Sequence, residues 1–438
     1  MKKFITTIRN IFSIEELRTR ILNTIGFLII FRLGSFVVLP GVDPNLLGEG
    51  GGGMLGLLDN FLGGAFSRAS IFGLGIMPYI SASIVIQLLT VAVPYFQKLQ
   101  KEGDSGRKKI TQITRVLTIA ITLGQSIAYL STAVAPEAVV IDNAFFTASS
   151  MILLTAGTIF CMWLGEKITE KGIGNGISML IMIGIIAQFP DSIVKEALAK
   201  GMSGALLFVL EIIALFFVVM ATVLLVQAVR RIPVQYAKQV VGNKVYGGQR
   251  QYIPLKVNAS GVMPIIFAQS LMFLPGLLSG FFADTNDTAA MVVRTFGDIT
   301  SWQYNLVFAV MIILFTFFYT AITINSSQIS DDLKRNGGFV PGVKPGRPTA
   351  DYIDAVLSRI TLPGSIFLAI IAILPALANL AGVIMEFSYF YGGTSLLIMV
   401  GVILDTLQQI ESYLLMRHYE GMMKSGKVRG RSQGAAVA

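Results

Sequence analysis

Side chains that commonly perform catalysis or bind metals are scarce in this sequence of 438 residues. It contains one cysteine, Cys161, and one histidine, His418, which excludes an intrachain disulfide and leaves no His/Cys cluster for a metal. The glycine run at 48–53 lacks the Gly-Lys-Ser/Thr of a phosphate-binding loop and indicates a flexible linker. We therefore expect no enzymatic activity and no cofactor.

Acidic residues in the apolar parts of the chain are equally few. Glu211 and Asp405 are the main candidates, and each falls nearer to an end of its apolar run than to the middle. Carriers coupled to protons or ions usually hold ionisable groups near the membrane midplane, where these groups bind the coupling ion. The sequence shows no such relay.

The composition predicts a protein that crosses the membrane many times. Hydrophobic residues make up 54% of the chain and charged residues 13%, and the mean hydropathy is +0.70. Apolar runs of about 20 residues match the thickness of the hydrocarbon core. Ten such runs are predicted as spans: 21–39, 74–93, 114–134, 146–165, 175–190, 205–229, 258–282, 305–325, 362–381 and 393–413.

Basic residues set the expected orientation. With the N-terminus in the cytoplasm, 28 of the 34 Lys and Arg residues fall on the cytoplasmic side and 4 on the opposite side. This bias follows the positive-inside rule, and ten spans return the chain to the side on which it started. Both termini are predicted to be cytoplasmic.

One short phrase occurs twice, as "GIMPYI" at 75–80 and "GVMPII" at 261–266. A second pair, in the fifth and tenth expected spans, has matching residues at 176–186 and 393–403. Two halves of five spans each must enter the membrane with opposite orientations, which predicts an inverted repeat with its functional site between the halves. Pro78 and Pro264 should then bend the second and seventh spans, although ordinary kinked packing is an alternative.

Longer segments carry a resemblance to a known family. They include "FRLGSFVVLPGVD", "KEGDSGRKKI", "WLGEKITEKGIGNGIS", "PLKVNASGVMP", "FVPGVKPG" and "YGGTSLLIMV", in this order along nearly the whole chain. The sequence resembles the SecY/Sec61-alpha family. The resemblance implies an all-α polytopic membrane protein of ten transmembrane helices in two inverted five-helix halves, with an hourglass pore, a lateral seam and a short re-entrant plug helix.

The expected organisation has four parts. These are a cytoplasmic amphipathic N-terminal segment (1–20), a first half with spans one to five (21–190), a second half with spans six to ten and cytoplasmic loops at 230–257 and 327–359 (191–413), and a cytoplasmic tail (414–438).

The segment at 54–70 is too short and too polar to cross the membrane. A re-entrant segment is tolerated where it is buried in protein or lines a cavity, and a helix lying at the membrane surface is the alternative. By resemblance it is the plug of the pore, for which we single out Leu55, Leu58, Phe61, Leu62, Phe66 and Arg68.

By the same resemblance, a ring of isoleucines forms the pore constriction: Ile76, Ile80, Ile177, Ile181, Ile266 and Ile398. Each could equally be a core or lipid-facing residue. As a ring, stiff β-branched side chains would exclude water and fit around a moving chain of any sequence. The seam, or lateral gate, is assigned to Pro78, Gln87, Gln125, Asn258 and Pro264, whose amides could instead simply satisfy one another within the bundle.

The two long basic loops are expected to bind partners. Their charge could merely orient the protein, but by resemblance they dock the SecA ATPase or the ribosome through Arg230, Arg231, Lys238, Lys244, Arg250, Lys334, Arg335, Lys344 and Arg347. The family usually has arginine where this chain has Lys344, and lysine lacks the bidentate fork of arginine.

The implied function is that of the central channel of a protein translocase in the bacterial cytoplasmic (inner) membrane. Such a channel passes unfolded preproteins and releases hydrophobic segments, including signal sequences, sideways into lipid. The expected partners are SecE and SecG subunits, SecA, the ribosome, preproteins and membrane lipid. The alternatives are an inverted-repeat secondary transporter for a small solute and a purely structural membrane scaffold.

Overall fold

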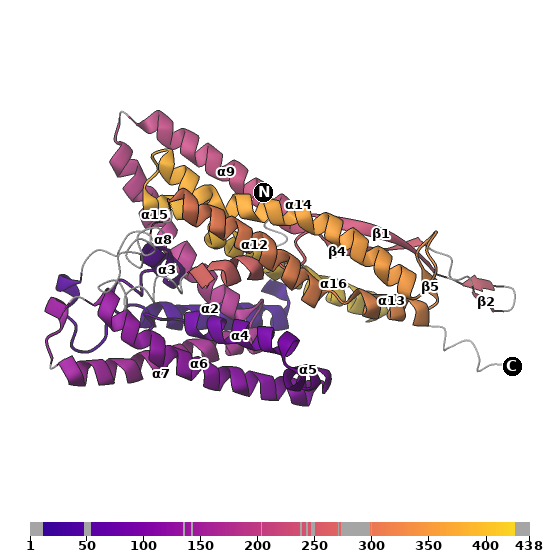
Figure 1. Ribbon diagram of the computed structural model, residues 1–438, viewed down its shortest axis with the longest axis horizontal. Coiled ribbons are helices and arrows are strands. Elements are labelled where there is room, and N and C mark those ends of the chain that lie inside the picture. Colours follow the sequence, from indigo (N-terminus) through magenta and orange to yellow (C-terminus); the bar gives the residue numbers. More distant parts are fainter. Residues whose placement is uncertain are drawn as a thin grey trace.

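The structure, a computed structural model, describes residues 12–47, 54–134, 136–141, 143–202, 204–236, 239–241, 244–246, 250–269, 271–272, 298 and 300–424. Most of these residues are helical. The long helices run along the long axis of the molecule, and the strands gather at one end of it (Figure 1).

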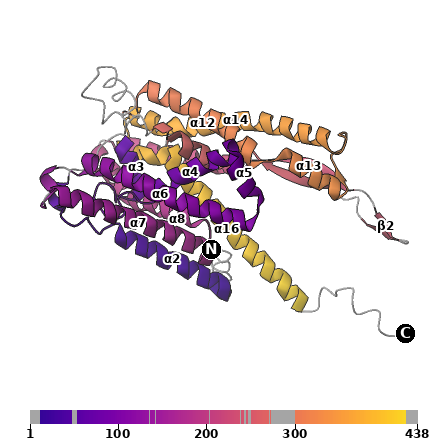
Figure 2. The same ribbon diagram turned by 60° about the horizontal axis from the view of Figure 1, so that its bottom comes forward.

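The first half of the chain supplies one group of helices. Their bounds are α2 (Glu15–Gly34), α3 (Met54–Leu62), α4 (Met77–Ala92), α5 (Pro94–Lys101), α6 (Asp104–Ala133), α7 (Asn143–Lys171) and α8 (Gly176–Lys200), with short 3-10 turns η1 (Pro44–Leu46) and η2 (Pro136–Ala138). The helices α2, α4, α6 and α7 lie together on one side of the molecule (Figures 1 and 2).

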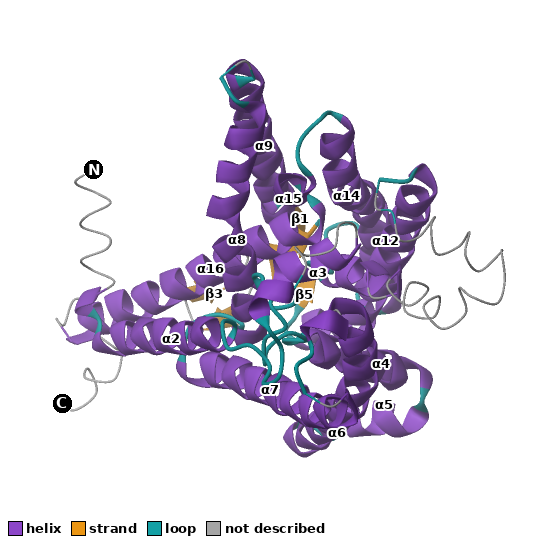
Figure 3. Ribbon diagram, turned by 90° about the vertical axis from the view of Figure 1, so that its left-hand side faces the viewer, coloured by secondary structure: helices purple, strands orange, loops and turns teal. Residues whose placement is uncertain are grey.

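The second half supplies α9 (Ala205–Gln227), α12 (Trp302–Thr323), α13 (Ser326–Arg335), α14 (Arg347–Leu380), α15 (Met385–Ser388), η3 (Tyr389–Tyr391) and α16 (Gly393–Lys424). Figure 2 shows α12 and α14 packed side by side, opposite the helices of the first half. Seen along the bundle in Figure 3, the short helix α3 lies in the middle of the surrounding helices.

A small sheet corrects the expectation of an all-α fold. The strands β1 (Val229–Tyr236) and β4 (Arg250–Lys256) pair antiparallel with Ile232 opposite Ile253, and β5 (Gly338–Phe339) adds a third strand beside β1. Strands β2 (Gln239–Val241) and β3 (Lys244–Tyr246) form a separate hairpin. Ile232 and Val234 are buried while Arg231 and Pro233 beside them are exposed, the alternation typical of a half-buried strand.

The second basic loop, 327–359, contains regular secondary structure. Helix α13 and the first turns of α14 occupy much of 327–359. Leu333, Val340, Ile353 and Leu357 pack against the buried side chains of β1 in one apolar cluster. We call this sheet with α13 and the start of α14 the basic lobe; it lies at one end of the molecule (Figure 1).

Seven helical segments in the described part of the chain are long and apolar enough to cross a membrane. The number is eight if α4 and α5, which meet at a bend of 97°, are counted as one span. Helix α2 begins at Glu15 and ends at Gly34, earlier than the expected 21–39, and its charged first turns keep it outside that number. Of the expected span at 258–282, residues 263–269 and 271–272 are helical, and most of the remainder lies outside the described residues.

Helix α8 contacts α3, α7, α9 and α16 and has well-defined ends. The side-chain oxygen of Asn175 accepts hydrogen bonds from the backbone N–H groups of Ile177 and Ser178, at 3.1 and 3.4 Å, which caps the first turn. The helix stops at Gly201, whose φ of +57° favours glycine.

Candidate functional site

The duplicated phrase has the same backbone geometry in both places. Gly75 and Gly261 have φ values of +50° and +63°, a left-handed conformation that glycine adopts at little cost. A helical turn follows each glycine: the N–H of Ile80 donates to the carbonyl of Ile76 at 3.1 Å, and the N–H of Ile266 donates to that of Val262 at 3.3 Å. Both phrases therefore mark a helix start.

This geometry corrects the expectation that the two prolines bend helix interiors. Pro78 lies in the first turn of α4, whose N-cap is Ile76, and Pro264 is the second residue of the helical stretch that begins at 263. A proline in the first turn costs no hydrogen bond, because that N–H would have no helical partner. The expected span at 74–93 is thus a turn up to Ile76 followed by a shorter helix.

The isoleucines of the proposed ring fall into two adjoining apolar clusters. Ile398 is buried in one cluster, against which Ile181 and Ile266 pack. Ile76 is buried in the other, with Ile80 and Ile177 packed against it. The first cluster joins residues from both halves of the chain.

Helix α3 and the turns after it are buried at the centre of the bundle. Phe61 belongs to the same apolar cluster as Ile181, Ile266 and Ile398, and Leu62 and Phe66 pack in a neighbouring cluster. Leu55 and Leu58 lie on the backbone of α3, and their side chains are outside the described part.

Polar contacts hold this segment against its neighbours. The carboxylate of Asp59 accepts hydrogen bonds from the backbone N–H and the hydroxyl of Ser67, at 3.0 and 2.9 Å. The side-chain amide of Gln188, on α8, donates to the backbone carbonyl of Asp59 at 3.0 Å. The hydroxyl of Tyr129, on α6, donates to the carbonyl of Phe66 at 2.7 Å. The segment is therefore tied both to itself and to two long helices.

Two arginines meet beside the segment. The Arg32 guanidinium donates to the carbonyl of Gly63 at 3.1 Å. It also lies 5.4 Å from the ring centre of Phe36, and the Arg68 guanidinium lies 4.6 Å from the same centre. Both distances suit cation–π contact. Arg68, expected in the plug, thus packs against the end of the first expected span.

Helices α3 and α8 come into backbone contact at Gly184. A Cβ atom built on Gly184 would lie 2.3 Å from the carbonyl oxygen of Phe61. No side chain fits at this position without moving one of the two backbones. Gly184 matches Gly401 in the second repeated pair, so the sequence singled it out, although nothing in the sequence showed what it touches.

Among the described residues, no polar contact joins the side chains assigned to the seam. Asn258 is buried and accepts a hydrogen bond from the hydroxyl of Ser260 at 3.3 Å. Gln87 on α4 has a buried side-chain oxygen without a partner among the described residues, and Gln125 is half-buried on α6, which packs against α4. Within the described part, neither a hydrogen bond nor an ion pair links α4 to residues 258–272.

Most of the basic side chains expected to bind partners lie on the basic lobe or in the turn between β5 and α14. Those whose side chains are described are all exposed: Arg230, Arg231, Lys334, Arg335, Lys344 and Arg347. Lys244 and Arg250 lie on strands with side chains outside the described part, and Lys238 lies outside the described residues altogether.

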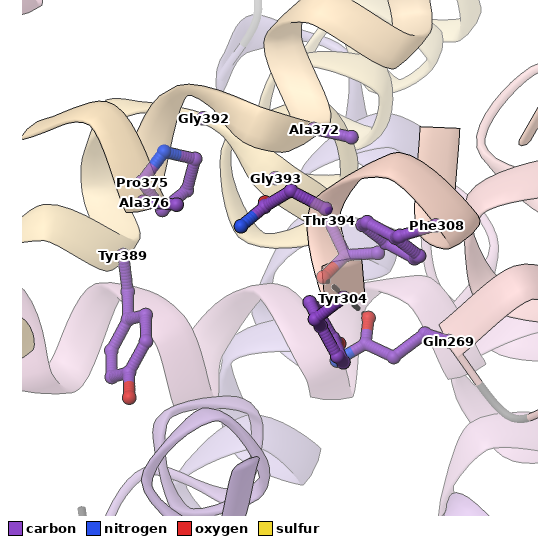
Figure 4. A pocket seen from close by; sticks show the side chains of 11 residues that line it. Gln269, Tyr304, Phe308, Ala372, Pro375, Ala376, Tyr389, Gly392, Gly393 and Thr394 are labelled. Atoms are coloured by element: carbon purple, nitrogen blue, oxygen red, sulfur yellow. Dashed lines mark hydrogen bonds between the residues drawn. The ribbon is translucent and has the colours of Figure 1, made fainter. Parts of the chain in front are cut away.

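A separate small cavity lies inside the second half (Figure 4). Its walls come from α12, α14 and the start of α16, and the hydroxyl of Thr394 donates to the side-chain oxygen of Gln269 at 2.8 Å across it. None of the lining residues is an acid, a lysine, an arginine, a histidine or a cysteine. The cavity therefore offers packing space and amide and hydroxyl groups rather than catalytic ones.

Sequence reasoning did not predict that α3 is seated by Arg32, Asp59, Gly184 and Gln188. Three of these are charged or polar side chains in largely apolar stretches, and such residues usually face protein rather than lipid. That signal could have identified them, but the partner of each is fixed only by the fold.

The fold and the site together define a class. A helical membrane protein with a buried central segment, surrounded by apolar side chains from two halves of the chain, has an architecture suited to a channel. Comparison with known proteins gives the family. The SecY family profile matches residues 70–407, and the chain belongs to the SecY family.

Relatives support the same assignment over the full length. The chain is 43% identical over 437 residues to the protein translocase subunit SecY of Streptomyces scabiei, covering 96% of this chain and 100% of that protein. It is 42% identical over 454 residues to that of Mycobacterium bovis, covering 97% and 100%.

Solved structures share the fold. One described as the structure of a protein conducting channel matches with a TM-score of 0.63 at 16% identity, covering 90% of this chain and 92% of the other. Sec61 in the canine ribosome-channel complex from the endoplasmic reticulum matches with a TM-score of 0.60 at 15% identity, covering 90% and 92%.

Proposed function

We propose that this protein is the central channel subunit of a protein translocase, which passes unfolded preproteins across the membrane and releases hydrophobic segments into lipid. One observation carries the proposal. Phe61 of the central segment packs in one cluster with Ile181 from the first half and Ile266 and Ile398 from the second. A segment held between two halves can close a path that opens when the halves part.

The isoleucines suit a pore for chains of any sequence. A constriction lined by apolar side chains excludes water when it is empty and offers no hydrogen bonds that would retain a particular sequence. β-Branched side chains are stiff at χ1, so the constriction keeps its width. In this proposal 54–70 is the plug, and all six isoleucines of the two adjoining clusters face the translocating chain.

The seam between α4 and 258–272 is the proposed lateral exit. Gln87, Gln125, Asn258, Pro78 and Pro264 lie on the elements that border it. The seam is closed by apolar packing without a polar link. The apolar side chains of a signal sequence can replace these apolar contacts, which supports a gate that such a sequence can open.

The remaining parts of the proposal concern topology and partners. The number of spans is ten, arranged as two inverted halves: α2 and the stretch at 258–282 are added to the eight apolar spans obtained when α4 and α5 are counted as one. The membrane is the bacterial cytoplasmic one, and both termini face the cytoplasm. The exposed arginines and lysines of the basic lobe bind SecA or the ribosome, and SecE and SecG complete the complex.

Site-specific crosslinking tests the proposed path. Single cysteines at 80, 181, 266 and 398, in a chain with Cys161→Ala, are reconstituted with SecE, SecG, SecA, ATP and a preprotein arrested midway. We expect each to crosslink to a cysteine in the preprotein. Phe217 on α9 is exposed on the outside of the bundle and is the control position.

Two outcomes would contradict the proposal. Crosslinks at 217 as strong as those at 80 and 266 would remove the pore assignment. Transport of a small solute that saturates and needs neither SecA nor ribosomes would favour the secondary transporter instead.

A further inference from the structure

Arg32 and Arg68 form a cationic pair that no acid in the described part of the chain neutralises. Their guanidinium groups lie 5.4 and 4.6 Å from the centre of the same Phe36 ring, so the two groups are at most about 10 Å apart. The ion pairs among the described residues include neither arginine. Two like charges this close repel each other, and an anion that contacts both relieves the repulsion.

Most N–H donors of the pair have no protein partner. Arg32 uses one of its donors on the carbonyl of Gly63, and Arg68 makes no hydrogen bond within the described part of the chain. An arginine carries five N–H donors. The carboxylate of Asp59, on the same central segment, accepts from the backbone N–H and the hydroxyl of Ser67 instead, at 3.0 and 2.9 Å. The pair therefore has the donors that an anionic ligand requires.

Two glycines make room for the guanidinium groups. A Cβ atom built on Gly63 would overlap with a terminal nitrogen of Arg32, and one built on Gly64 would lie 3.3 Å from a terminal nitrogen of Arg68. Both glycines have positive φ values, +65° and +82°, which other residues adopt only with strain. The two arginines therefore rest on bare backbone at the end of α3.

The pair also differs from the other basic residues expected on the outer side of the membrane. The described lysines of that side pair with acids at 3.0 and 2.9 Å: Lys195 with Glu386 and Lys200 with Glu211. Arg294 lies outside the described residues. Among the described residues of this side, the positive charge without an acidic partner is that of Arg32 and Arg68, near the point where α2 ends.

An exposed apolar stripe leads away from the pair along α2. Its members follow one another at intervals of three or four residues, which places them on one helix face. Their exposed fractions range from 48% to 65%: Leu22, Ile25, Ile29, Leu33 and Phe36. From Ile25 to Gly34 the helix rises by about 14 Å, close to half of the hydrocarbon thickness, about 15 Å. The stripe therefore matches the depth of one lipid leaflet.

We propose that Arg32 and Arg68 bind the phosphate of an anionic phospholipid of the outer leaflet, with an acyl chain along the stripe of α2. Arginine binds phosphate oxygens through paired N–H donors. Because Arg32 belongs to α2 and Arg68 follows the central segment, the bound lipid joins the two and favours the seated segment. The lipid thus regulates closure, and this inference rests on the proposed channel function.

Photolabelling of the idle complex tests the site directly. The purified complex with SecE and SecG is reconstituted in phosphatidylcholine vesicles that contain phosphatidylglycerol with a photoreactive group beside its phosphate. Mass spectrometry then locates the label, which we expect on residues 33–37. Arg68→Gln should reduce this label about fivefold, the effect typical of one basic side chain at an anionic membrane surface. Arg68→Lys keeps the charge and should retain most of the label.

The control removes a different cation from the outer side. Lys195 is exposed and already paired with Glu386, so Lys195→Gln should leave the label at 33–37 unchanged. If Arg68→Gln does not fold, Phe36→Ala removes the ring beneath both guanidinium groups at another exposed position and should lower the label as well. An unlabelled 33–37 in the unmodified complex, as when another subunit covers the stripe, or equal loss in Lys195→Gln, would overturn the inference.

Potassium efflux from idle vesicles measures the effect on closure and separates a lipid from a free anion. Phosphatidylglycerol should slow efflux through the unmodified complex about fivefold relative to phosphatidylcholine alone, and Arg68→Gln should abolish this difference. An equal slowing by soluble glycerol phosphate in phosphatidylcholine vesicles would show that the ligand is a free anion and that the lipid assignment is wrong. Failure of the proposed function would appear differently, because the label at 33–37 would persist while the unmodified complex translocated no preprotein.

Discussion

Replacing Gly184 by alanine should unseat the central segment. A Cβ at this position would lie 2.3 Å from the carbonyl oxygen of Phe61, whereas ordinary contacts begin at 3.4 Å, so one backbone must retreat by about 1.1 Å. Forcing an extra methyl group into a packed site costs about 1–3 kcal/mol. Alanine also favours the helix by roughly 0.5–1 kcal/mol, but this gain applies equally whether the segment is seated or displaced.

The balance between seated and displaced segments should therefore move by the whole packing cost. A shift of about 1–3 kcal/mol changes an equilibrium by roughly 5- to 150-fold. The assay is potassium efflux from proteoliposomes that contain the idle complex, and we expect faster efflux from Gly184→Ala. The segment should also become accessible to proteases or thiol reagents from the extracytoplasmic side.

A matched control exists on α6. Gly124 is also a glycine inside a helix, and a Cβ built on it meets nothing within 4 Å, so Gly124→Ala tests the substitution without the clash. Equal efflux from the two variants would refute the argument that close approach of α8 seats the segment. Slower efflux from Gly184→Ala than from the unmodified chain would refute it as well.

Three further predictions concern the plug, the lobe and the seam. Arg32→Met removes the charged donor to the Gly63 carbonyl, worth about 1.5–3 kcal/mol, and should raise idle leak roughly 10- to 150-fold; unchanged leak would exclude this contact from the seat. Lys344→Glu reverses an exposed charge on the basic lobe and should strongly reduce SecA-dependent translocation with insertion unchanged; full activity in proteoliposomes would contradict the docking assignment. Asn258→Leu should shift gate opening by about 0.5–2 kcal/mol; signal sequences of graded hydrophobicity measure this shift, and an unaltered threshold would argue against Asn258 as a gate residue.

The duplicated phrase illustrates how far the sequence reaches. The repeat predicted that 75–80 and 261–266 share a structure, and their backbones do. The prediction that Pro78 bends a helix was wrong, because the apolar residues before it were assigned to a membrane span. A proline bends a helix only if the helix has already begun. Before Pro78 the chain forms turns in which Leu62 packs against Gly75, a contact that the local sequence does not reveal.

The basic lobe shows a different limit. Its charge was recognised, but the alternation of Ile232 and Val234 with Arg231, Pro233 and Gln235 was not interpreted as a strand. Strand pairing joins Ile232 to Ile253, across about twenty residues rich in turn signals. Such non-local contacts are only weakly predicted by the sequence of either strand alone, whereas a long apolar helix is predicted by the length of its apolar run.

The connection of the lobe to the bundle has a further consequence. Strand β1 starts at Val229, two residues after α9 ends, and β4 ends at Lys256, two residues before Asn258. A hydrogen bond of 2.9 Å from the N–H of Val257 to the carbonyl of Ala228 joins the two chain segments that connect β1 and β4 to the bundle. The β1–β4 strand pair is therefore a lever about 26 Å long, attached to the bundle without a flexible linker. A partner that tilts its far end applies torque directly to α9 and to the residues that border the seam.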